Sequence, residues 1–181
     1  DRVDLQGSFD LKRQIFEKVK LDIAIAEVAT YTKNLLSPEQ PINAGIRANL
    51  KLSGPFLEPD ALADVTLKAV QLNDIEIPAA IFKLRSSGRR IHIDLAQVNA
   101  PSGEAKLAGN LLRGRADANF DLELTDLTLF RHKTLLALKK PGHILFTRSG
   151  DLSIEDLSLG GPIGDIRLKG SLTKQKKTDF K

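Results

Sequence analysis

Strict alternation of apolar and polar residues between Ile46 and Leu129 constrains this chain more than any other feature. Residues 46–52, 91–95 and 120–125 each place an apolar side chain at every second position. Successive side chains of a β-strand point to opposite faces, so a period of two predicts a sheet with one apolar and one polar face. What covers the apolar face therefore decides the architecture.

The same alternation continues on both sides of this stretch. About eleven strands are expected, joined by short turns at Gly, Pro, Asn and Ser, and they do not alternate with helices. This order predicts an all-β antiparallel meander. Phase slips near Ala69 and Asp126 predict β-bulges, and Pro78 predicts a bend, a bulge or an edge position. Residues 131–140 fit either a strand or one helical turn.

Two segments depart from the alternation. Residues 26–36 place apolar side chains at helical spacing, so one short amphipathic helix is expected there. Lysines near the C-terminus indicate a solvated tail over 174–181. Because the chain has no methionine, even at position 1, we interpret residues 1–181 as a single fragment of a longer β-rich repeat protein.

Composition argues against several classes of function. The chain has no cysteine, and its 3 histidines lack the spacing of metal ligands. No nucleophile elbow, phosphate loop or dinucleotide fingerprint occurs, so we expect no enzyme, no cofactor and no metal. The net charge of +4 is spread along the chain, and aromatic residues are few. Nucleic acid is therefore not an expected partner.

A short pattern occurs four times, with an apolar residue, Leu, Gly and then Phe or Leu at alternate positions. Its glycines are Gly7, Gly54, Gly109 and Gly170, at irregular intervals. The pattern predicts a degenerate repeat in which glycine, having no side chain, leaves a gap in the apolar face or lets a curved strand bend. The alternative is ordinary glycine at strand ends.

The run INAGIRANLKLSGPFLEPDALADVTLKAVQLNDIEIPAA, followed by GEAKLAGNL and SGDLSIEDLSLGGPIGDIRLKGSL, resembles proteins of the TamB and AsmA-like family. The shared features are strands ending in Leu-x-Gly, an x-Pro-Asp turn and a later Gly-Asp-Leu hairpin. The resemblance implies an elongated β-taco, or half-pipe, in the periplasm of a diderm bacterium, with an inner-membrane anchor in the parent chain. It also implies phospholipid as cargo and an outer-membrane β-barrel assembly protein as a partner.

Two functions are compatible with these features. The first is a periplasmic lipid-transport module, in which an open hydrophobic groove shields phospholipid acyl chains between the inner and outer membranes. The alternative is a structural or interaction module with a closed sandwich or barrel, which assists outer-membrane protein assembly by pairing an edge strand with a barrel partner. Periodicity alone favours the closed module, and the resemblance favours the groove.

The groove-lining residues are expected to be the apolar residues at alternate positions of the central and C-terminal strands. They are Ile46, Leu50, Leu52, Val65, Leu67, Phe82, Leu84, Ile91, Ile93, Leu95, Leu107, Phe120, Leu122, Leu124, Ile144, Phe146, Leu152, Ile154, Ile166 and Leu168.

Overall fold

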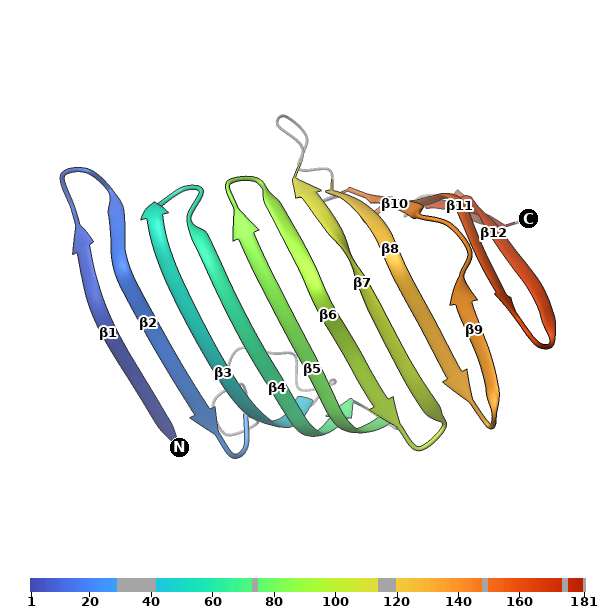
Figure 1. The fold of residues 1–181 in the computed structure, drawn as a ribbon, viewed down its shortest axis with the longest axis horizontal. Helices are drawn as coiled ribbons and strands as arrows, with labels where there is room; N and C mark the ends of the chain where they lie inside the picture. Colours follow the sequence, from blue (N-terminus) through green and yellow to red (C-terminus); the bar gives the residue numbers. More distant parts are fainter. Residues whose placement is uncertain (29–41, 73–74, 114–119, 148–149, 174–175, 181) are drawn as a thin grey trace.

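The computed structural model describes residues 1–28, 42–72, 75–113, 120–147, 150–173 and 176–180. These residues form one antiparallel sheet of 13 strands and no helix (Figure 1). The strands are β1 (Arg2–Asp10), β2 (Ile15–Ile25), β3 (Ile42–Pro55), β4 (Asp60–Leu72), β5 (Ile75–Ser87), β6 (Arg90–Ala100), β7 (Gly103–Arg113), β8 (Phe120–Arg131), β9 (Thr134–Leu138), β10 (Gly142–Phe146), β11 (Leu152–Gly161), β12 (Gly164–Thr173) and β13 (Lys176–Phe180).

The sheet is open rather than closed into a barrel. Its outermost strands are β1 and β13, and no pairing joins them within the described ranges. Figure 1 shows β1 to β8 side by side in one layer, with β10 to β12 running at an angle to them and the two termini at opposite ends. The predicted elongated, all-β antiparallel meander is confirmed.

Strands β9 and β10 share one position in this sheet. Strand β10 pairs with the first half of β8, β9 pairs with the second half, and both pair with β11 on the other side. Residues 139–141 interrupt them, where Pro141 has no amide hydrogen to donate. The two strands are therefore one broken strand, which explains why residues 131–140 fitted no single pattern in the sequence.

Two bulges expected from the sequence are present. Ala69 in β4 has a positive φ of 49°, and the β3–β4 register shifts there, so that Ala69 and Val70 together oppose Ala44 of β3. In the β7–β8 ladder Gly109 pairs with Leu124, whereas the preceding residue Ala108 pairs with Asp126, so Thr125 has no partner in β7. A bulge inserts one residue, so residues beyond it change faces relative to a strict alternation.

A third bulge corrects the assignment of Leu95. The β5–β6 register places Ile93 opposite Leu84 but Leu95 opposite Lys83. The expectation that Leu95 lines the groove with Ile93 is wrong, because the inserted residue places Leu95 on the charged side of the sheet. Ala96, the next residue, takes the apolar position opposite Phe82.

The remaining differences lie in two segments. The strands beyond the expected eleven are β9 and β13. Strand β13 pairs with β12, so residues 176–180 of the expected solvated tail form an edge strand. The helix expected at 26–36 lies, from residue 29 onward, outside the described residues.

Ala69 provides a test of the bulge in β4. An L-residue in the left-handed region costs about 1–2 kcal/mol, and glycine avoids this cost. We therefore expect Ala69→Gly to raise the free energy of unfolding by up to about 1 kcal/mol. The control is Ala63→Gly in the same strand, which should lower it by about 0.5–1 kcal/mol because glycine weakens a regular strand. Denaturant unfolding measures both, and a loss of stability in Ala69→Gly would contradict the prediction.

Candidate functional site

The register places the apolar side chains of neighbouring strands in continuous rows across one side of the sheet. Residues directly opposite each other in an antiparallel pair point to the same face, so these rows can be traced from strand to strand. The central row consists of Leu5, Leu21, Leu50, Ala63, Leu84, Ile93, Gly109, Leu124 and Gly142. One adjacent row consists of Val3, Ile23, Ala48, Val65, Phe82, Ala96, Leu107 and Leu127. We call this side of the sheet the apolar face.

Apart from Leu95, every residue expected to line the groove lies on the apolar face. The face reaches the C-terminal strands because Leu122 opposes Ile144, which opposes Ile154. Beyond a register shift in β11, Leu157 and Leu159 oppose Leu168 and Ile166 of β12. The structure thus brings the predicted residues together on one surface.

Several members of the apolar face were missed by the sequence reasoning. Val98 and Leu129 follow the bulges in β6 and β8, and Leu136 lies in the broken strand opposite Leu129. The signal for Val98 was present, since the run Asp94-Leu95-Ala96 breaks the alternation and resets its phase. No comparable signal marks Leu136, because its strand has only five residues.

The apolar face has no second layer over it in the described part of the chain. Buried hydrophobic residues there are only Ala44, Ala80, Leu124, Leu157 and Leu159, and no large side chain is fully buried. A two-layer sandwich would enclose large side chains from both sheets in a dry core. Contacts between the described strands also join only neighbours in the sheet. The described strands therefore do not form a closed sandwich.

Aromatic residues mark two places on the apolar face. Phe9 and Phe56, from the first two copies of the glycine pattern, meet Phe16 with ring centroids 5.2–5.7 Å apart. Farther along the sheet, Phe120 and Phe146 stack at 5.4 Å. Phe56 remains 52% exposed, so this cluster ends in solvent rather than in a core.

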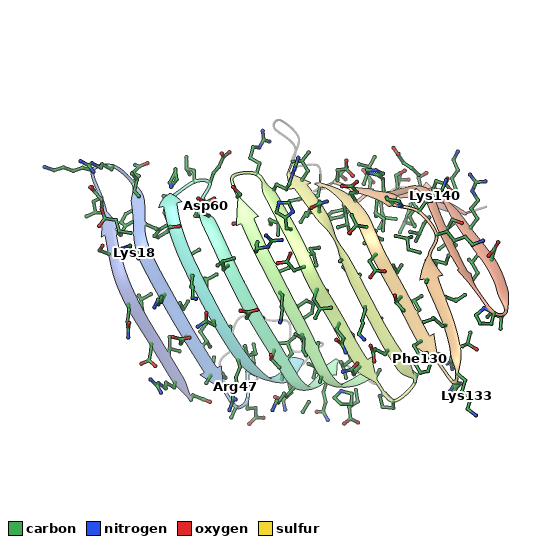
Figure 2. The ribbon with its side chains drawn as sticks, viewed as in Figure 1. Lys18, Arg47, Asp60, Phe130, Lys133 and Lys140 are labelled. Atoms are coloured by element: carbon green, nitrogen blue, oxygen red, sulfur yellow. The ribbon has the colours of Figure 1, made fainter. Side chains whose placement is uncertain are left out.

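The opposite face carries charged and polar side chains that satisfy one another. Arg85 donates two hydrogen bonds of 2.6 Å to Asp94, which raises the pKa of the guanidinium and lowers that of the carboxyl. His92 lies on this face, with its Nδ1 2.6 Å from Asn110 Oδ1, and Asn110 donates to Glu123 at 3.0 Å. Figure 2 shows side chains such as Lys18 and Asp60 projecting into solvent around the sheet.

Asp156 is the most strongly perturbed acid on the described residues. It lies at the register shift in β11, where Arg167 donates from Nε at 2.8 Å and from Nη2 at 3.2 Å, and Lys140 donates from the junction of β9 and β10. These hydrogen bonds lower the pKa of the Asp156 carboxyl from 3.8 to about 2. Asp156 therefore ties the broken strand to β12 through charge.

No family model, curated protein or solved structure matches this chain. In the described residues no group of His, Cys, Asp and Glu side chains has the arrangement of a metal site. The described residues also contain no helix with the length and apolarity needed to cross a membrane. The candidate site is accordingly defined by the apolar face itself.

Asp156 generates a prediction with a defined pH dependence. Because its pKa is lower in the folded state, its contribution to stability is present above about pH 4 and is lost as the pH falls toward 2. We expect Asp156→Asn to be less stable than the wild type at pH 7, with the difference shrinking between pH 5 and pH 2. Denaturant midpoints measured across this range test it. Asp126→Asn, at the bulge in β8, is the control for exchanging an aspartate for asparagine. A difference between Asp156→Asn and the wild type that stays constant down to pH 2 would contradict the prediction.

Proposed function

We propose that this chain is a lipid-binding and transport module, whose apolar face shields the acyl chains of phospholipids during passage between two membranes. The observation that carries the proposal is the continuity of the apolar face across the described strands, together with the absence of a second protein layer over it there. An uncovered apolar surface of this extent is unusual on a soluble domain and marks a site for an apolar partner.

The chemistry of the apolar face suits a mobile acyl chain. Hydrophobic attraction is non-directional, and a surface of Leu, Ile, Val and Ala presents no polar group that a sliding chain would have to desolvate. Each buried methylene contributes about 0.8 kcal/mol, so a chain of a dozen carbons gains at most roughly 10 kcal/mol before entropic losses. A strand spacing of about 4.8 Å gives the sheet a width on the order of 50 Å.

The cellular setting of the proposal comes from the resemblance to the TamB and AsmA-like family. It supports a periplasmic location in a diderm bacterium, with the parent chain anchored in the inner membrane and phospholipid as the cargo. The resemblance depends on strands with Leu-x-Gly ends, an x-Pro-Asp turn and a later Gly-Asp-Leu hairpin, and it implies an open half-pipe. The open meander of the described strands agrees with that architecture.

A second candidate function is strand pairing with an outer-membrane β-barrel assembly protein. Strand β1 is an open edge, and its Val3 and Leu5 are 61% and 69% exposed. Such an edge can accept a further strand through backbone hydrogen bonds. Under this alternative, a charge in the middle of the apolar face leaves partner binding unchanged, whereas a disrupted β1 removes it.

Replacing Ile93 tests the lipid-binding function. The substitution Ile93→Glu places a carboxylate in the central row of the apolar face, where an acyl chain would have to desolvate it at a cost of several kcal/mol. We expect at least a roughly tenfold loss of affinity for a fluorescent phospholipid and loss of phospholipid that co-purifies in native mass spectrometry.

The matched control is Gln97→Glu. It introduces the same side chain on the same strand, but on the charged face opposite Lys106. It should bind lipid as the wild type does, and circular dichroism should show that both variants keep their strand content. A wild-type protein that takes up no lipid, or equal binding by both variants, would contradict the proposed function.

A further inference from the structure

The turn between β8 and β9 carries three basic residues at one edge of the apolar face. Arg131 pairs with Thr134, and the two residues between them, His132 and Lys133, have φ values of 45° and 71°. Two positive φ values are typical of a type I′ turn, which strongly favours Asn-Gly. This sequence instead places basic side chains there, and we call Arg131, His132 and Lys133 the cationic turn. Figure 2 shows Lys133 at the tip of this hairpin.

A pocket of about 570 Å³ lies directly beside the cationic turn. One cross-strand row lines it with Val98, Ala105, Leu129 and Leu136, and Arg131 and His132 also reach it. Ile163 lines the same pocket from the turn between β11 and β12. The C-terminal hairpin therefore approaches the apolar face here, and the pocket has an apolar floor beside a basic rim.

Arg131 belongs to the apolar side of β8, because it lies two residues beyond Leu129. Gly103 lies beside it on β7, and a Cβ there would lie 2.2 Å from the Phe130 carbonyl oxygen and 3.3 Å from Arg131 Cα. A larger residue at position 103 is excluded by this close approach. Position 103, the β7 position nearest to Arg131, therefore contributes no side chain to the rim.

The charge of the cationic turn is not neutralised by the residues around it. Glu104 also lines the pocket, but its carboxylate is 2.5 Å from Lys106 Nζ. Within the described ranges, none of the three basic side chains of the cationic turn makes an ion pair or a side-chain hydrogen bond. A ligand that reaches the rim thus meets uncompensated positive charge.

We propose that the cationic turn and its pocket form a headgroup site that selects lipids with a net negative oxyanion headgroup. The inference rests on the proposed function, because the acyl chain of the same lipid would lie on the apolar face. Arginine binds phosphate and carboxylate oxygens through paired N–H donors, and Lys133 adds a second positive charge at the turn. The apolar floor alone cannot distinguish headgroups, so selectivity arises at the rim.

The test compares two phospholipids with identical fluorescent acyl chains, phosphatidylglycerol, which is anionic, and phosphatidylcholine, which is zwitterionic. The wild-type protein should bind phosphatidylglycerol roughly threefold or more tightly at low salt, and this preference should shrink as salt screens the charge. Arg131→Gln combined with Lys133→Gln should remove the preference by weakening phosphatidylglycerol binding more than phosphatidylcholine binding. Lys12→Gln combined with Arg13→Gln, at the β1–β2 turn, removes the same charge elsewhere and should keep the preference.

A second variant separates headgroup binding from the stability of the turn. Arg131→Gln with His132→Asn and Lys133→Gly removes all three basic groups while giving the turn its favoured Asn-Gly pair, so its unfolding midpoint should be at least that of the wild type. Loss of the preference in this stable variant supports the proposal. The headgroup site is overturned if the wild type binds both lipids equally, or if the preference survives in the double or the triple variant of the cationic turn. Either result leaves the apolar face intact as a lipid site. Failure of the wild type to bind either lipid overturns the proposed function and this inference with it.

Discussion

Cross-strand contact between apolar side chains is the interaction on which the described structure depends. A single-layer sheet has no second layer to pack against, so each strand is stabilised by the backbone ladder and by the side chains directly opposite on its two neighbours. The rows that contain Leu50 and Val65 show this arrangement, since each member contacts the next strand rather than a distant part of the chain. The register therefore has to keep the apolar rows of neighbouring strands on one side across the described strands.

Bulges are the means by which the register is kept. At Ala69, and again between Leu124 and Asp126, one inserted residue resets the alternation so that the apolar positions on both sides of the bulge remain on one face. The broken strand formed by β9 and β10 has a comparable effect on a larger scale. Asp156, held between Lys140 and Arg167, fixes the neighbouring irregularity in β11 by charge rather than by packing.

The sequence was sufficient to predict the antiparallel meander and to group nearly all of the residues expected in the groove on one face, because period-two alternation depends only on local strand geometry. It assigned Leu95 to the wrong face, since a bulge is set by pairing with the adjacent strand and leaves only a weak trace in one sequence. It left the segment of β9 open between a strand and a helical turn, because five residues are too few to show a period. The cationic turn was missed for a related reason: the residues of its pocket come from β6, β7, β8, β9 and the turn after β11, and only the fold brings them together.

The broken strand also determines how this sheet could be joined to others. Because β9 and β10 occupy a single position, the described strands fill an even number of positions in the sheet, and β13 runs in the opposite direction to β1. A second sheet of the same kind, shifted along the long axis without rotation, would thus meet β13 with an antiparallel first strand. Strand direction alone would therefore allow such units to be joined edge to edge into one longer antiparallel sheet.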